Sequence, residues 1–339
     1  MRLKLLPSIL VLALFATSAL AAPQVRYRLT LISSPSLVGG LSATALNNRG
    51  EVVGTAGATD GPFPFVWRDG QFVDLKSRIS AGAEYIELTG INDRSQIVGF
   101  YVDPDTNQFR GFLLDRRQVT NVQGPPTAEA VFLGPINDRE QILGSFYDAE
   151  GNEGAFINDQ GSVRTLDPSF AAIDINLSGV VSGTLFPERR AAIWEDGEII
   201  PIAPAPSDGR DINDRGQVIG LLVGSGTRAF VWERGRLTVL PALLENQTRN
   251  LANDINNSGR IVGETAMNQL DHTLQLATVW DNGQVADLNT LIHPDDPLRP
   301  YVTLTAGTLI NDRGEIVAQG TDSRVGYLQY YFLEPVHGH

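Results

Sequence analysis

The chain has 339 residues and no cysteine, and its 26 Lys and Arg against 39 Asp and Glu give a formal net charge of −13. An acidic chain without a basic run is a poor partner for nucleic acid or an anionic membrane surface, because both are negatively charged. The lack of cysteine excludes disulfides and thiolate chemistry, and a chain of this length can bury a sizeable core without them.

The N-terminal segment has the features of a secretory signal peptide. Arg2 and Lys4 precede an apolar run from Leu5, and Ala19-Leu20-Ala21 forms a small-residue cleavage site. We expect residues 1–21 to be removed after Ala21, which leaves 24 basic against 39 acidic residues and a net charge of −15. The apolar run is short for a membrane span and nothing later replaces it, so we expect an exported protein, periplasmic or extracellular, without a membrane span.

The rest of the chain, residues 22–339, reads as one domain built from seven copies of a unit of about forty residues, a period typical of solenoids and propellers. Each copy has an Asn directly after an apolar residue, as in the clearest copy, DINDRGQVIG from Asp211. The seven anchors are Asn47, Asn92, Asn137, Asn176, Asn213, Asn256 and Asn311. A glycine follows seven residues later in six copies, and Ala318 takes its place in the seventh.

Each copy predicts four strands. Asn, Asp and Gly after an apolar strand form a turn, because they tolerate left-handed dihedrals and bond their own backbone. A second hairpin follows in most copies, as in FVWRDGQFVDL from Phe65, with the Asp-Gly signal of a tight turn. All four tryptophans share one place in this hairpin: Trp67, Trp194, Trp232 and Trp280. We interpret that place as a core position, with a stacking platform for sugars as the alternative.

These elements predict an all-β fold, a seven-bladed β-propeller with four antiparallel strands per blade. The seventh copy ends one strand short, and the alternating stretch Val25–Ile32 stands alone before the first anchor. We therefore expect Val25–Ile32 to close the last blade, which would leave no open sheet edge.

The repeat resembles the bacterial extracellular family of HAF repeats, named after a His-Ala-Phe step. That step corresponds here to Arg228-Ala229-Phe230 and Gly154-Ala155-Phe156, without the His. The C-terminal pattern is also similar, with DLNTLI from Asp287, LINDRGEIVAQG from Leu309 and YFLEP from Tyr331. The resemblance covers residues 25–336. It implies an exported repeat protein and no particular activity, since the family has no established common function.

Three carboxylates recur two residues before the anchor, at Asp174, Asp211 and Asp254. If the strand entering the anchor is innermost, these side chains gather near the axis, where a divalent cation such as calcium would keep them together. The alternative is that each Asp bonds backbone nearby and no cofactor is present.

A second candidate site depends on loop length. The two turns in each copy lie at one end of the strands, and the connections at the other end vary in length. The two longest are residues 264–276 and the insert Leu288–Tyr301. We expect a ligand site there, because variable loops on a rigid scaffold commonly bind ligands. Its residues would be His272, His293, Asp295, Asp296 and Arg299; the alternative is that the insert merely connects two blades.

No sequence motif of a hydrolase, zinc enzyme or nucleotide-binding enzyme is present. We expect an exported, non-catalytic binding or interaction module, a monomer whose extracytoplasmic ligand is a glycan or a protein. The alternative is a polysaccharide-directed hydrolase or lyase on the same scaffold, and a purely structural surface protein is a third possibility. A catalytic site would need Asp, Glu, His or Tyr side chains that converge for acid–base chemistry.

Overall fold

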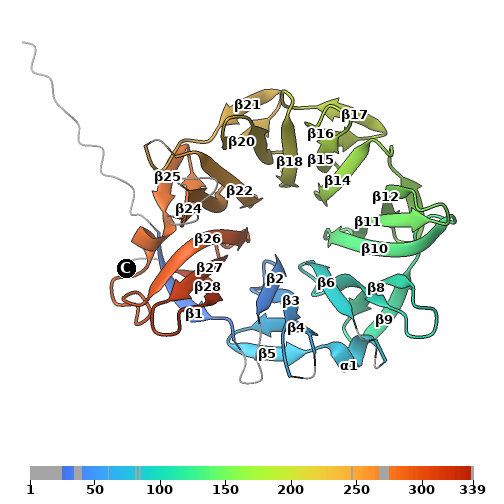
Figure 1. The fold of residues 1–339 in the computed structure, drawn as a ribbon, viewed down its shortest axis with the longest axis horizontal. Coiled ribbons are helices and arrows are strands. Elements are labelled where there is room, and N and C mark those ends of the chain that lie inside the picture. The colour runs from blue at the N-terminus through green and yellow to red at the C-terminus, as the bar shows by residue number, and fades with distance from the viewer. Residues whose placement is uncertain are drawn as a thin grey trace, which may run out of the picture.

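The computed structural model describes residues 25–33, 40–59, 61–80, 82–83, 85–245, 247–266 and 275–336. The predicted signal peptide therefore lies outside the described residues. Strands form small sheets arranged as a ring around a central axis (Figure 1). Among the described residues, the helices are the short α1 (Lys76–Ile79) and the 3-10 turn η1 (Leu288–Leu291). The predicted all-β propeller fold is confirmed.

The first three repeats each contribute four consecutive antiparallel strands, counted from the axis outward. The first has β2 (Leu41–Leu46), β3 (Val52–Ala56), β4 (Phe63–Arg68) and β5 (Gln71–Asp74). The second has β6 (Ile86–Ile91), β7 (Ile97–Val102), β8 (Phe109–Asp115) and β9 (Gln118–Val122). The third has β10 (Ala128–Ile136), β11 (Gln141–Asp148), β12 (Glu153–Asp159) and β13 (Ser162–Thr165).

The remaining repeats follow the same plan. The fourth has β14 (Phe170–Ile175), β15 (Val181–Leu185), β16 (Arg190–Glu195) and β17 (Glu198–Pro201). The fifth has β18 (Ser207–Ile212), β19 (Val218–Val223), β20 (Thr227–Glu233) and β21 (Arg236–Val239). The sixth has β22 (Arg249–Ile255), β23 (Ile261–Ala266), β24 (Gln275–Asp281) and β25 (Gln284–Asp287). The seventh has β26 (Val302–Ile310), β27 (Ile316–Asp322) and β28 (Leu328–Val336).

The prediction of seven separate blades is wrong. The structure has five four-stranded blades, and β18 to β25 form a single eight-stranded sheet instead of two further blades. The fifth and sixth repeats are joined through one parallel pair, Thr227 of β20 with Arg249 of β22. The connection between these repeats places the first residue of β22 beside the first residue of β20, and Thr227 N–H donates to the carbonyl of Thr248 at 3.0 Å.

The N-terminal strand closes the ring, as predicted. β1 (Arg26–Leu31) pairs antiparallel with β28 and completes a four-stranded blade with β26 and β27. Tyr27 and Leu29 of β1 are buried against the core of the seventh repeat. β1 and β28 lie side by side in Figure 1, although they come from opposite ends of the chain.

The glycine that recurs seven residues after the anchor has a steric cause. The innermost strand bulges opposite it, as between Ala43 and Ala45 in the first repeat. A Cβ on Gly54 would lie 1.9 Å from the carbonyl oxygen of Ser42, and one on Gly263 would lie 1.8 Å from that of Leu251. In these repeats a side chain would clash where the second strand passes this close to the bulge. In the seventh repeat the position is Ala318, and its partner on the inner strand is Gly307.

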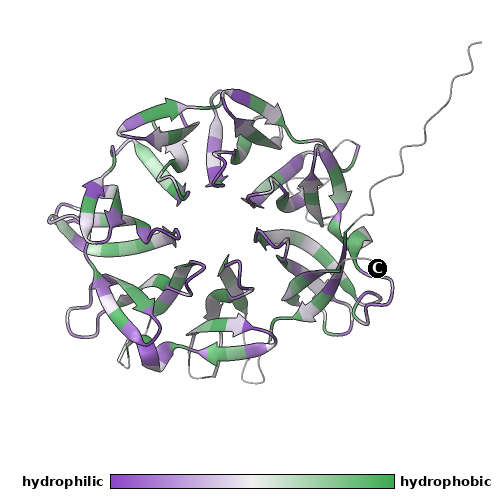
Figure 2. Ribbon diagram, turned by 180° about the vertical axis from the view of Figure 1, so that it is seen from behind, coloured by the Kyte–Doolittle hydropathy of each residue, from purple (hydrophilic) through white to green (hydrophobic). Residues whose placement is uncertain are grey.

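The core lies between neighbouring sheets. Val98 of the second repeat packs with Val131, Leu133 and Phe156 of the third, and similar clusters join the other repeats. Figure 2 shows hydrophobic segments along the strands and hydrophilic segments at many of the connecting turns. Trp67, Trp194 and Trp280 are buried, so they serve as core residues rather than as an exposed platform.

Candidate functional site

The seven anchor asparagines form a closed ring around the axis on one face of the propeller. We call this face the turn face, because both tight turns of each repeat lie on it. Each anchor Nδ2 donates to the backbone carbonyl of the next anchor, at 2.9–3.3 Å, and Asn311 completes the circle by donating to Asn47. Each anchor Oδ1 accepts the backbone N–H groups of its own turn. Each anchor Asn therefore stabilises its own turn through Oδ1 and bonds to the next repeat through Nδ2.

The residues that follow the anchors form a second ring, nearer to solvent. These residues are Asn48, Asp93, Asp138, Leu177, Asp214, Asn257 and Asp312. In six repeats the backbone N–H donates to the side chain of the corresponding residue in the next repeat, at 2.6–2.8 Å. The ring is interrupted after Asp138, because the side chain of Leu177 has no acceptor. Burial and the neighbouring Asp93 carboxyl raise the pKa of Asp138.

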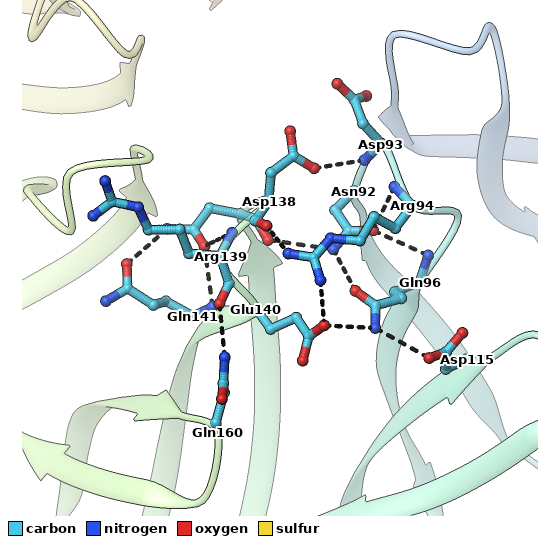
Figure 3. Close-up of polar contacts among 11 residues, drawn as sticks. Asn92, Asp93, Arg94, Gln96, Asp115, Asp138, Arg139, Glu140, Gln141 and Gln160 are labelled. Carbon is cyan, nitrogen blue, oxygen red and sulfur yellow. Dashed lines mark hydrogen bonds and ion pairs between the residues drawn. The ribbon is translucent and has the colours of Figure 1, made fainter.

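Longer side chains reinforce these rings between the second and third repeats (Figure 3). Arg94 reaches across to Glu140 at 2.6 Å and to the carbonyl of Asp138. Glu140 stands where most repeats have the turn glycine, and its φ of 64° is left-handed. Such a conformation is unfavourable for glutamate. A glycine here would avoid this strain but could not form the ion pair with Arg94.

A polar funnel of ≈ 220 Å³ opens at the centre of the turn face, lined by residues of both rings. Most of its polar groups already form hydrogen bonds to a neighbouring repeat. Asn257, for example, donates its amide Nδ2 to the carboxylates of Asp214 at 2.8 Å and Asp312 at 2.9 Å. Because these groups maintain the ring, the funnel has few free groups with which to recognise a ligand.

The three carboxyls predicted to hold a cation lie beside one another around the axis, on the inner strands β14, β18 and β22. Asp174, Asp211 and Asp254 each accept the N–H of an isoleucine on the next inner strand, at 3.3, 2.8 and 2.7 Å. Adjacent carboxyls are also within hydrogen-bonding reach of each other, and burial raises the pKa of all three, most strongly at Asp174 and Asp211.

Raised pKa values mean that these carboxyls can share protons instead of repelling one another. Within the part of the chain that the structure describes, no group of three or more Asp, Glu, His or Cys is arranged to hold a metal ion. The divalent cation at this position stays a prediction.

The structure brings together part of the loop site predicted beside the sixth repeat. Asp296 is buried and its two oxygens accept the N–H groups of Leu29 and Leu298, both at 2.8 Å. The N–H of His293 donates to the carbonyl of Tyr27 at 2.8 Å. These residues thus hold the closing strand β1 in place, while Asp295 and Arg299 are exposed. His272 lies outside the described residues, so the set of five stays a prediction.

The face opposite to the turns, which we call the variable face, has a larger cleft. It measures ≈ 530 Å³ and lies between the third and fourth repeats. Phe132 of β10, Gly154 of β12, and Phe170 and Ile173 of β14 line it, together with Phe186 from the connection after β15. Ile173 and Phe186 of this cleft are 49% and 45% exposed, so its wall presents apolar surface to solvent.

Five aromatic side chains continue this cleft across the second and third repeats. Centroid distances of 4.7–6.5 Å link them into one group, the aromatic platform: Tyr85, Phe100, Phe109, Phe132 and Tyr147. Tyr85 and Tyr147 are exposed, and the three phenylalanines are half-buried between them. Phe132 belongs to both the platform and the cleft wall.

The repeat pattern of the sequence did not predict this platform. The seven-fold pattern identifies only residues that recur, and the platform residues have no counterpart in most other repeats. The available signal was compositional, because the second and third copies carry aromatics beside the glycine, as in Gly99-Phe100-Tyr101 and Gly144-Ser145-Phe146-Tyr147. Nothing in that signal showed that Phe100 and Phe109 of the second repeat would meet Phe132 of the third.

Comparisons with solved structures support the fold. An oligogalacturonate lyase in complex with manganese aligns with a TM-score of 0.56 at 11% identity, over 93% of this chain and 98% of the lyase. The β-propeller domain of the Trilobed protease from Pyrococcus furiosus aligns with a TM-score of 0.55 at 9% identity, over 88% of this chain and 94% of that domain. That domain has an open velcro topology, whereas β1 here pairs with β28.

A puromycin-hydrolyzing peptidase from Mycobacterium tuberculosis aligns with a TM-score of 0.54 at 12% identity, over 91% of this chain but only 55% of the peptidase. The chain thus spans about half of that enzyme. At these identities the likeness shows a propeller fold and no particular activity.

No protein-family model and no curated protein matches the chain. The resemblance to HAF repeats therefore stays a prediction. In the described part of the chain, no helix has the length and apolar character needed to cross a membrane.

Proposed function

We propose that this protein is an exported, non-catalytic binding module whose ligand lies on the variable face. The observation that carries the proposal is the aromatic platform, which shares Phe132 with the wall of the ≈ 530 Å³ cleft between the third and fourth repeats. Ligand sites commonly have about 300–1,000 Å³ of mainly apolar volume with a few polar groups. Here Ser145 and Glu153 supply side-chain polar groups among apolar walls.

The alternative, a polysaccharide-directed hydrolase or lyase, has weaker support. Glycoside hydrolysis commonly uses two carboxyl groups that flank the scissile bond. Glu153 is the one carboxylate among the described residues that line the cleft. The oligogalacturonate lyase and the puromycin-hydrolyzing peptidase share the propeller fold with this chain, but at 11% and 12% identity their activities do not support the same activity here.

The test is a thermal-shift screen of the mature protein against soluble glycans, secreted-protein fragments and divalent cations. A ligand that binds only the folded state stabilises it by about 2.7 kcal/mol at one hundred times its Kd. Tyr147→Ala should abolish the shift caused by a true ligand and leave the melting temperature of the free protein nearly unchanged, because Tyr147 is 40% exposed.

Tyr327→Ala is the matched control. Tyr327 is 60% exposed and stands in the connection between β27 and β28, away from the cleft. The placement of the site would be contradicted if the thermal shift caused by a ligand persisted in Tyr147→Ala. It would also be contradicted if Tyr327→Ala abolished that shift as completely as Tyr147→Ala does.

A further inference from the structure

The rings of the aromatic platform are packed against one another without a ligand. Phe132 is fixed by Phe109 at 4.7 Å, by Phe100 at 5.0 Å and by Tyr147 at 6.0 Å between ring centroids. Two of these contacts are edge-to-face, the geometry that aromatic quadrupoles favour. Held rings lose little conformational entropy on binding, so a flat apolar partner can stack on them at low cost.

Two tyrosine–glutamate pairs bound the platform. Tyr85 donates its hydroxyl to Glu87, and Tyr147 donates its hydroxyl to Glu153 at 3.4 Å. The hydrogen bond to Glu87 raises the pKa of Tyr85 to about 12, so this phenol stays protonated. A carboxylate has about four acceptor sites in total, so each glutamate can still accept hydrogen bonds from hydroxyl groups of a ligand.

This arrangement favours a ligand with an apolar face and hydroxyl donors at its edge. A purely apolar ligand would desolvate Glu87 and Glu153 without replacing their hydrogen bonds to water, which is costly. A polyanion would meet these two carboxylates and a mature chain with 39 acidic against 24 basic residues. Both like-charge effects oppose its approach. A pyranose ring meets the requirement, because its C–H groups form an apolar face and its hydroxyls project around the edge.

We infer that the cleft and the aromatic platform bind a neutral glycan. One sugar ring stacks on the exposed Tyr147, with its edge beside Phe132, whose ring is perpendicular to that of Tyr147. The hydroxyls of this sugar are donated to Glu153, which already accepts the hydroxyl of Tyr147. The platform extends from Tyr147 to Tyr85, so a second sugar of the same chain lies toward Glu87. This inference rests on the proposed function and adds the chemical class of the ligand.

The test is isothermal titration of the mature protein with neutral soluble glucan, xylan and galactomannan oligosaccharides, and with oligogalacturonate as the charged comparison. We expect at least one neutral oligosaccharide to bind. Tyr147→Ala should weaken that binding at least tenfold, Tyr147→Phe should keep it within about threefold because stacking is retained, and Tyr327→Ala should leave it unchanged. Near-UV circular dichroism confirms that each variant is folded.

Two other outcomes separate the failure of this inference from the failure of the proposed function. If oligogalacturonate or the apolar dye ANS binds in a way that Tyr147→Ala abolishes, and no neutral oligosaccharide binds, the neutral-glycan inference is overturned while the binding function stands. If no molecule in the titrations or in the thermal-shift screen binds in a manner sensitive to Tyr147→Ala, both are overturned.

Discussion

The two faces of the propeller use their side chains differently. On the turn face, polar groups repeat around the axis and bond to the next repeat, so that seven asparagines close a circle. On the variable face, the second and third repeats have aromatic rings with no equivalent in most other repeats, and two of them are exposed. The contrast indicates that repetition in this chain maintains the fold, whereas the surface that we propose for a ligand consists of departures from repetition.

The largest effect should come from removing the closing strand. A chain that begins at Ser34 loses β1, and with it the buried side chains of Tyr27 and Leu29. Full burial of each such side chain contributes about 1.5–3 kcal/mol, and β28 would become an open edge. We expect aggregation, or a melting temperature far below that of the chain that begins at Ala22, in circular dichroism. Equal melting temperatures would show that ring closure contributes nothing.

The next effect tests the anchor ring. Asn213→Ala removes the bond to the carbonyl of Asn256 and leaves the N–H groups of Arg215 and Gln217 without their acceptor. Because unsatisfied buried groups cost about 1–3 kcal/mol each, we expect roughly 2–4 kcal/mol of destabilisation in urea unfolding. Asn121→Ala, on the outer strand β9, is the control and should cost less than about 0.5 kcal/mol. If the two variants lost similar amounts of unfolding free energy, the anchor ring would not stabilise the fold more than an ordinary surface asparagine does.

A smaller effect should separate neighbouring aspartates of the insert. Asp296→Ala leaves the N–H groups of Leu29 and Leu298 without their carboxylate, and we expect a loss of about 1–3 kcal/mol. Asp295→Ala changes an exposed side chain and should be neutral. The comparison is made by thermal unfolding of both variants. If Asp295→Ala proved as destabilising as Asp296→Ala, the insert would not act by anchoring β1.

The smallest expected effect concerns pH. The folded-state pKa of Asp211 lies well above its ordinary value because of burial and the neighbouring Asp254. An acid whose pKa is raised by folding contributes stability that is present below the unfolded pKa and lost as pH rises through the folded pKa. Asp211→Asn cannot ionise, so the melting temperature of this variant relative to the natural protein should be higher at pH 8 than at pH 4.5.

The same experiment bears on the predicted cation. A calcium ion at Asp174, Asp211 and Asp254 would favour the ionised form and reverse this trend in the natural protein when calcium is added. If the difference between Asp211→Asn and the natural protein does not change with pH, the carboxyls do not share protons as their geometry indicates.

Much of the fold was predictable because it depends on local chemistry. The Asn turn, the Asp-Gly hairpin and the glycine opposite each bulge are set by backbone dihedrals and close approach, which residue type reveals. The role of Val25–Ile32 followed from a strand count, since an unpaired strand and an incomplete repeat complete each other. The loop site was less predictable, because sequence cannot distinguish a carboxylate that faces solvent from one that accepts buried backbone N–H groups, as Asp296 does.

The sequence by itself determined the number of repeats, the strands within each and the closure of the ring, because these follow from short-range turn geometry and the alternation of apolar residues. Only the tertiary structure decided that the fifth and sixth repeats share one sheet, through the pair of Thr227 with Arg249. It also decided that Tyr85 and Tyr147 belong to one aromatic platform, since three phenylalanines from two repeats link them. Both features depend on contacts between residues that are far apart in the sequence, and only the packing of the folded chain brings such residues together.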